Sequence, residues 1–334
     1  MLGPAGASRR LTAEPMEVPR NSGTAERLYR SMYLIRRVEE EIIRLYPSDK
    51  IKSPVHLSIG QEAVSAAVCD HLERSDYVFG TYRGHALYLA KGGDLPRMMA
   101  ELYGKAHGAA RGKAGSMHLV DVDVGMMGTS AIVATGISNA VGAALALKMR
   151  RSTAIVVCFF GEGAVDEGSF HESINFASLK RLPIVFVCEN NFYAIYSHVK
   201  DRLAGPGLVE RARSYGVTAE RIEDGDALAC HAAVGSAIEA VRRGEGPRFL
   251  ECMTYRWRDH VGPGEDRQYH YRPEAELDLK IRNDNLAALG RLLPSDLKQL
   301  IEAEEEARIA AAIDWAEKGE FPAASEIRNH VFAD

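Results

Sequence analysis

The central part of the chain alternates two kinds of segment, and this alternation restricts its fold more than any other feature. Two uninterrupted apolar runs, residues 155–160 and 184–188, have the length and composition of strands covered on both faces. Segments with helical spacing precede and follow the first run, at residues 135–150 and 167–179. Because buried parallel strands joined by helices form a doubly wound sheet, the sequence predicts an α/β fold with a mostly parallel sheet and helices on both faces.

The flanking segments indicate how the chain is divided. Residues 1–24 are rich in Gly, Ala, Pro, Ser and Arg, and we expect a disordered arm there. The α/β domain is expected over residues 25–272, opening with an amphipathic helix whose glutamates 39–41 lie on its polar faces. A helical extension of the same domain is expected over residues 273–334. A glycine-rich loop at 104–130 is long enough to predict a functional role.

Composition excludes several classes of function. The 334 residues carry a net charge of −5, which gives no basic footprint for nucleic acid. No apolar stretch is long enough to cross a bilayer, and the five cysteines lack CxxC spacing, so we expect a cytoplasmic protein with no membrane contact. Asp166 breaks the GxGxxG pattern that starts at Gly161, and GxxxxGK[ST] does not occur. Neither nicotinamide nor nucleoside triphosphate binding is supported.

Two polar motifs follow the two apolar runs directly. Glu162 lies between two glycines after the first run, and Asn191 follows the second. Alone, the Gly-Glu-Gly motif favours an ordinary turn by about two to one. Because parallel strands end at one edge of a sheet, however, both motifs should meet there. The oxygens of Glu162 and Asn191, with the backbone carbonyl of Tyr193, suit a Mg²⁺ ion that carries a diphosphate, which predicts a thiamine diphosphate site.

With these motifs in place, the chain resembles a known family over residues 27–327. It is similar to the alpha subunit of the heterotetrameric thiamine-diphosphate-dependent dehydrogenases for pyruvate, branched-chain 2-oxo acids and acetoin. The twenty-six residues that separate the Gly-Glu-Gly and Asn-Asn motifs match the family spacing. The resemblance rests on the blocks HLSIGQEA (56–63), TYRGHA (81–86), GKAGSMH (112–118), ENNFYAI (189–195) and TYRWRDH (254–260).

The resemblance implies a role for each matched residue. It makes Glu162, Asn191 and Tyr193 the metal ligands. His260 is implied as the catalytic histidine, and His56 as a second histidine at the substrate entrance together with His118, although a purely structural role for these two is equally consistent with the local sequence. The local pattern alone would place Arg256 at the surface. The remaining implied cofactor contacts are Tyr82, Arg83 and Arg256 for the diphosphate, the backbone of Gly163 and Ala164, and Ala131 and Val133 for the aminopyrimidine.

The same resemblance implies partners and a reaction. A beta subunit would supply the glutamate that activates the cofactor, in an α₂β₂ assembly, and a lipoyl acyltransferase would accept the acyl group. The expected enzyme is an oxidoreductase that decarboxylates a 2-oxo acid, or cleaves acetoin, and transfers the acyl unit to a lipoyl group. Two alternatives stay open. One is a biosynthetic carboligase that delivers a two-carbon ketol or acyl unit to a sugar or a carrier protein instead of a lipoyl group, and the other is a non-catalytic assembly subunit.

Overall fold

A single parallel sheet organises the fold. The computed structural model describes residues 23–329 and 331, and all strand pairings in its six-stranded sheet are parallel, in the order β2-β1-β3-β4-β8-β7. The predicted fold class is therefore confirmed. The strands, including a small separate β5-β6 hairpin, are β1 (Tyr77–Thr81), β2 (Met126–Ser130), β3 (Val156–Gly161), β4 (Ile184–Asn190), β5 (Tyr193–Ala194), β6 (Ser197–His198), β7 (Thr218–Ile222) and β8 (Arg248–Met253).

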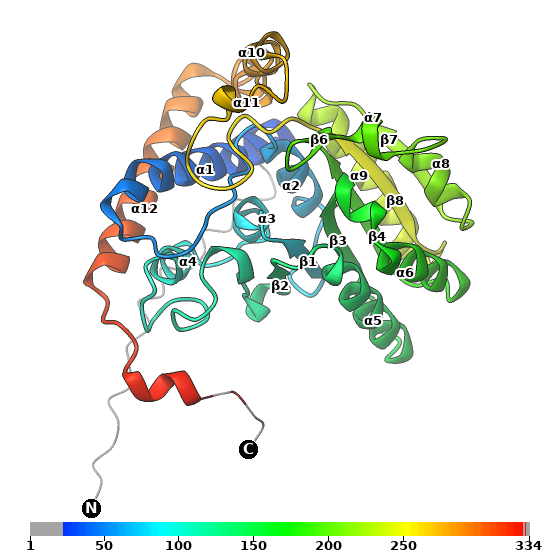
Figure 1. Ribbon diagram of the computed structural model, residues 1–334, viewed down its shortest axis with the longest axis horizontal. Coiled ribbons are helices and arrows are strands. Elements are labelled where there is room, and N and C mark those ends of the chain that lie inside the picture. The colour runs from blue at the N-terminus through cyan, green and yellow to red at the C-terminus, as the bar shows by residue number, and fades with distance from the viewer. Residues whose placement is uncertain (1–22, 330, 332–334) are drawn as a thin grey trace, which may run out of the picture.

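Helices cover both faces of the sheet, as Figure 1 shows. Helices α1, α2, α3, α4, α9 and α12 contribute to the core on one face, and α5, α6 and α8 to the core on the other. The helix bounds are α1 (Thr24–Leu45), α2 (Glu62–Cys69), α3 (His85–Ala90), α4 (Leu95–Leu102), α5 (Thr135–Met149), α6 (Gly168–Leu179), α7 (Val199–Arg202), α8 (Leu208–Arg213), α9 (Ala227–Arg242), α10 (Glu274–Arg282), α11 (Asn285–Gly290) and α12 (Ser295–Lys318).

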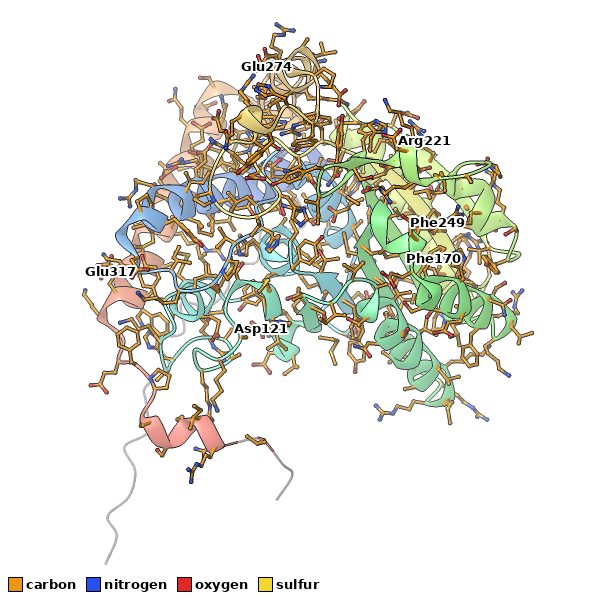
Figure 2. The ribbon with its side chains drawn as sticks, in the orientation of Figure 1. Asp121, Phe170, Arg221, Phe249, Glu274 and Glu317 are labelled. Atoms are coloured by element: carbon orange, nitrogen blue, oxygen red, sulfur yellow. The ribbon has the colours of Figure 1, made fainter. Side chains whose placement is uncertain are left out.

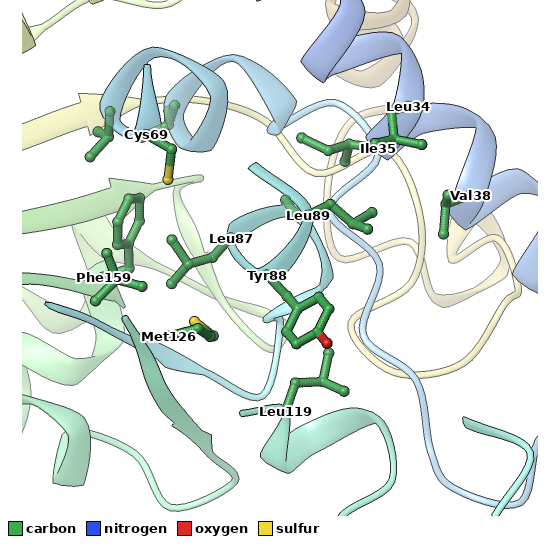
Figure 3. Close-up of a cluster of buried hydrophobic side chains, with 14 of the residues drawn as sticks. Leu34, Ile35, Val38, Cys69, Leu87, Tyr88, Leu89, Leu119, Met126 and Phe159 are labelled. Atoms are coloured by element: carbon green, nitrogen blue, oxygen red, sulfur yellow. The ribbon is translucent and has the colours of Figure 1, made fainter. Parts of the chain in front are cut away.

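The continuous apolar runs fill two cores at once, because successive side chains of a strand point to opposite faces. In β3, Phe159 joins the core to which α1, α2 and α3 contribute, where it lies in the same cluster as Cys69, Leu87 and Met126 (Figure 3). Its neighbour Phe160 belongs to the other core. There Phe170 of α6 and Phe249 of β8 have ring centroids 6.2 Å apart, and both are labelled in Figure 2.

The structure differs from the sequence-based expectation at the sheet edges. The last residues of the expected 104–130 loop form β2, and β7 was not anticipated. Both are edge strands with polar or glycine positions, so neither shows the apolar run of a central strand. Helix α1 begins at Thr24, and the rest of the predicted arm, residues 1–22, lies outside the described residues. Within the described chain, no helix combines the length and apolarity that a membrane span requires.

Candidate active site

The predicted cofactor residues converge at the carboxyl edge of the sheet. Tyr82 and Arg83 follow β1, and Ala131 follows β2. Glu162 follows β3, and Asn191 follows β4. In the sheet, Gly161 pairs with Glu189, so the ends of β3 and β4 lie side by side. The strand order runs from β1 to β2 in one direction and from β1 to β3 in the other, and such a reversal opens a crevice where α/β sheets bind ligands.

The three proposed metal donors lie on neighbouring strand ends. Glu162 is only 2% exposed, and burial, opposed by Arg202, raises its pKa to about 6. Arg202 donates from Nη2 to Glu162 Oε1 at 2.6 Å. Asn191 donates to Gln61 Oε1 at 3.0 Å, and its own Oδ1 accepts from the backbone N–H of Tyr193 at 3.1 Å. Carboxylate, amide and carbonyl oxygens are the donors that Mg²⁺ prefers, so this set fits that ion.

Gly163 allows the turn after β3 to approach the segment after β4. A Cβ atom at Gly163 would lie 2.8 Å from the Cβ of Ala194. That spacing is too short for any larger residue without movement of the backbone. The absence of a side chain at Gly163 therefore permits the close approach of these two segments. The next residue, Ala164, is buried.

Arg83 is a desolvated cation without a carboxylate partner among the described residues. Its guanidinium donates to two backbone carbonyls, of Leu57 at 2.6 Å and of His260 at 3.2 Å. Burial, with Arg256 nearby, lowers the pKa of Arg83 to about 10. The same desolvation acts on Glu189. Its burial, opposed by the positive charge of Arg83, raises the pKa of Glu189 to about 7. A partly buried guanidinium that makes no ion pair with a described carboxylate favours the binding of an anion.

Two histidines and a tyrosine lie beside this cation. The ring of His56 is 4.4 Å from that of Tyr82 and 5.3 Å from that of His260, measured between centroids. Burial and the positive charge of Arg83 lower the pKa of both histidines to about 3. Each imidazole is therefore neutral at physiological pH. Nδ1 of His56 is buried and has no hydrogen-bond partner among the described residues.

Backbone contacts between two distant loops bring these histidines together. The N–H of Trp257 donates to the carbonyl of Ile59 at 3.0 Å, and the N–H of Gly262 donates to that of Val55 at 2.7 Å. Gly60 permits this pairing, because a Cβ atom there would lie 2.4 Å from the carbonyl oxygen of Tyr255. The glycine also adopts φ +95°, which other residues avoid. The segment around residues 55–60 thus positions the loop that contains His260.

The local prediction that Arg256 lies at the surface is wrong. Arg256 is 1% exposed, and its guanidinium pairs with Asp266 at 3.3 Å and with the Tyr271 hydroxyl at 3.0 Å. Arg272 shares the same carboxylate at 2.7 Å. The residues of this network follow β8 and lie up to sixteen positions apart in the sequence. No short motif therefore predicts it.

Other predicted residues occupy the rim of the site. Val133 is 45% exposed, and its neighbour Ile132 is 66% exposed, so apolar side chains project from the turn after β2. Ala131 is partly buried beside them. His118 is exposed, and its Nδ1 lies 3.3 Å from the carbonyl of Thr129. No ring contact joins His118 to the His56–His260 pair in the described part of the chain.

Sequence reasoning missed Arg202, which contacts a proposed metal ligand forty residues away. It also missed Gln61, although the HLSIGQEA block contains that residue. Its place in that block could have identified Gln61 as a site residue. Arg202 is a single arginine in a polar segment, and nothing in the local sequence indicates its contact with Glu162.

Comparison with known proteins now decides the family. Residues 30–325 match the family model described as dehydrogenase E1 component. The chain belongs to this family. The E1 chain is 37% identical over 308 residues to the alpha subunit of acetoin:2,6-dichlorophenolindophenol oxidoreductase from Bacillus subtilis, which covers 91% of this chain and 92% of that one. It is 36% identical over 321 residues to the chloroplastic pyruvate dehydrogenase E1 component subunit alpha-3 of Arabidopsis thaliana, and this alignment covers 92% of this chain and 74% of that one.

A solved structure agrees on the fold. Transketolase from Campylobacter jejuni superposes with a TM-score of 0.54 at 16% identity, covering 92% of the E1 chain and half of the transketolase. At this identity the likeness supports the fold alone. Together with the relatives, the family match confirms that the E1 chain is an alpha-type subunit of a dehydrogenase and an oxidoreductase. The carboligase alternative is not favoured.

Proposed function

We propose that this E1 chain binds thiamine diphosphate and Mg²⁺ at the carboxyl edge of its sheet and acts with a separate beta subunit on pyruvate or acetoin. Arg83 carries the proposal, because its partly buried charge makes no ion pair with a carboxylate of the described chain. A diphosphate would supply the missing charge. The relatives point to the substrates, since they are named as acetoin and pyruvate enzymes.

Each part of the site would have a separate task. Glu162, Asn191 and the carbonyl of Tyr193 would hold Mg²⁺, and Tyr82, Arg83, Arg256 and the backbone of Gly163 and Ala164 would hold the diphosphate. Ala131 and Val133 would contact the aminopyrimidine. When bound, the cofactor supplies a nucleophilic carbon that attacks the substrate carbonyl. His260, neutral because of burial and Arg83, can donate a hydrogen bond to the developing oxyanion, with His56 beside it.

The proposal includes partners. The exposed side chains of Ile132 and Val133 at the rim suit coverage by another chain. We assign that position to a beta subunit, which would contribute the activating glutamate within an α₂β₂ assembly. A lipoyl acyltransferase would then accept the acyl group. A cytoplasmic location is part of the same proposal.

Calorimetry on the E1 chain co-expressed with its cognate beta subunit tests the cofactor assignment. We expect thiamine diphosphate to bind only with Mg²⁺ present. Glu162→Ala should weaken that binding at least about 100-fold, because it removes a charged metal ligand. Glu167→Ala is the matched control, since this exposed glutamate lies five residues further on. Normal cofactor retention by Glu162→Ala would refute the metal assignment.

Activity assays separate the remaining alternatives. Pyruvate, branched-chain 2-oxo acids, acetoin and ketose phosphates are each offered with an artificial electron acceptor. Turnover of pyruvate or acetoin supports the proposal. Turnover of ketose phosphates alone would establish the carboligase, and cofactor binding without any turnover would establish the assembly subunit.

A further inference from the structure

A buried polar cluster lies behind the candidate active site and has no part in the chemistry proposed above. It consists of Glu39 on α1, Ser58 in the loop before α2, His85 at the start of α3, and Ser116 in the glycine-rich loop. Glu39, His85 and Ser116 are completely buried, and Ser58 is 3% exposed. The sequence placed Glu39 on a polar helix face with Glu40 and Glu41, so its burial corrects that expectation. A buried carboxylate is costly to desolvate and needs a reason to be there.

The Glu39 carboxylate accepts hydrogen bonds from Ser58 and His85, and His85 is in turn hydrogen-bonded to Ser116. The backbone N–H of Ser58 lies 2.9 and 2.7 Å from its two oxygens. His85 Nδ1 lies 3.3 Å from Oε1, and His85 Nε2 lies 2.7 Å from the hydroxyl oxygen of Ser116. Because an ionised carboxylate only accepts hydrogen bonds, the Nδ1–H of His85 donates to Glu39. In the neutral ring, Nε2 then accepts from the Ser116 hydroxyl.

Each arm of the cluster ends close to a residue of the site. Ser58 lies two positions after His56. His85 lies two positions after Arg83, and Ser116 lies two positions before His118. Two segments that are remote in sequence therefore bond directly to one carboxylate, and the glycine-rich loop is connected to it through His85. Two-residue separations leave little freedom between the attached atom and the site side chain.

The glycine-rich loop has a second buried anchor. Glu101 on α4 is 1% exposed, and its carboxylate accepts hydrogen bonds from four backbone N–H groups at 2.8–3.0 Å. These groups belong to Ala110, Gly112, Ala114 and Gly115. The N–H groups of this loop thus point to the protein's own carboxylate and not to a phosphate. Ser116 continues directly from the anchored segment to the Glu39 cluster.

We propose that Glu39 is a positioning residue of the active site. Its carboxylate fixes His56 relative to the Tyr82–Arg83 turn, and His85 extends that control to the loop that ends at His118. Glu39 touches neither substrate nor cofactor. The inference rests on the proposed function, since it concerns the placement of the residues assigned there.

Glu39→Gln tests the proposal, because the amide has the same shape but only one acceptor oxygen. The Ser58 N–H contacts both carboxylate oxygens, so it would face an NH₂ group in either orientation of the amide, in a buried site. In the complex with the beta subunit, we expect thiamine diphosphate with Mg²⁺ to bind at least about tenfold more weakly, the loss expected from one unpaired buried donor. We also expect faster hydrogen–deuterium exchange confined to residues 55–62, 82–88 and 112–118.

Glu305→Gln is the matched control. Glu305 is 2% exposed and pairs with Arg30 at 3.0 Å, so it is an equally buried glutamate in contact with α1 but on another element, α12. This variant should lower the melting temperature without changing exchange in the three segments or the cofactor affinity. A purely structural role for Glu39 predicts the same pattern for both variants.

The outcomes separate the inference from the proposed function. If the wild-type complex does not bind the cofactor, the proposed function fails, and the exchange data still test whether Glu39 holds the three loops. If the wild type binds and Glu39→Gln binds within twofold of it, the positioning role is refuted. Should Glu39→Gln not assemble, Ser116→Ala replaces it, with faster exchange at 83–88 and about threefold weaker binding expected from the lost His85 contact. No change in Ser116→Ala would equally refute the role.

Discussion

Replacing Arg83 with Gln should weaken cofactor binding strongly without destabilising the protein that lacks the cofactor. In the structure, the Arg83 guanidinium donates hydrogen bonds to two backbone carbonyls, and it forms no ion pair with a carboxylate of the described residues. Gln is shorter and neutral, and it retains one side-chain NH₂ donor for a carbonyl. The substitution therefore removes the charge while it keeps part of the hydrogen bonding.

The magnitude follows from the burial of the guanidinium. A pKa of about 10 for Arg83 corresponds to a penalty of about 3 kcal/mol for its charged form. Removing the charge recovers this energy, and the carbonyl left without a donor costs about 1–3 kcal/mol. The free energy of unfolding should therefore change little or rise by about 1–2 kcal/mol. Cofactor binding should lose about 3–4 kcal/mol, or roughly 100- to 1,000-fold, since a unit charge at 4 Å contributes about 4 kcal/mol near a protein surface.

Two measurements check this prediction. Calorimetry of thiamine diphosphate with Mg²⁺ gives the affinity of the complex with the beta subunit, and urea unfolding gives the stability without cofactor. Arg258→Gln is the control, because Arg258 lies in the same loop as Arg256 but is partly exposed and pairs with Glu265 at 3.1 Å. The reasoning is refuted if Arg83→Gln lowers the stability by more than about 3 kcal/mol while the affinity stays within threefold of the wild type.

Two further predictions concern the histidines. His260→Ala should leave thiamine diphosphate bound but lower the rate of acyl transfer about 100-fold, which calorimetry and a lipoamide reduction assay would show; loss of binding would place His260 with the cofactor ligands instead. The buried neutral ring of His56 should make the protein less stable in acid. The pKa of His56 is about 3 in the folded protein and near 6.5 in the unfolded chain. Its contribution to the free energy of unfolding is therefore complete above pH 6.5 and is lost as the pH falls toward 3. Between pH 6.5 and 5, wild type should lose about 2 kcal/mol more than His56→Asn, and equal losses in urea titrations would contradict the burial of a neutral ring.

The sequence predicted the central sheet well and its edges poorly, for a physical reason. Strands β3 and β4 are covered on both faces, so their residues before the carboxyl ends are apolar, and the runs marked their positions within one or two residues. Strand β7 lies at an edge, and only two of its five residues, Ala219 and Ile222, are buried, so its sequence shows neither an apolar run nor a regular alternation. Glycine and polar residues in β2 hid it inside a predicted loop.

The candidate site was predictable only where short blocks carried it. Glu162 and Asn191 follow strands directly, so the ends of the apolar runs located them. The cluster around Glu39 depends on contacts among segments 19 to 46 residues apart in the sequence. Three consecutive glutamates, 39–41, look alike in the sequence, and only packing of α1 against the loop before α2 selects Glu39 for burial. Tertiary context, not local pattern, made that distinction.

The charges of the site explain why this chain would need a second subunit. Proton transfer at the cofactor requires a carboxyl group that is free to bind the ligand. Glu162 is paired with Arg202, and Asp266 is shared by Arg256 and Arg272. Glu189, with its pKa raised to about 7, lies beside Arg83 at the diphosphate end proposed for the site. Glu162 and Asp266 are thus paired with cations, while the rim exposes Ile132 and Val133. With this distribution the chain would hold the anionic end of the proposed cofactor, and the beta subunit proposed at the rim would supply the proton-transferring carboxyl group.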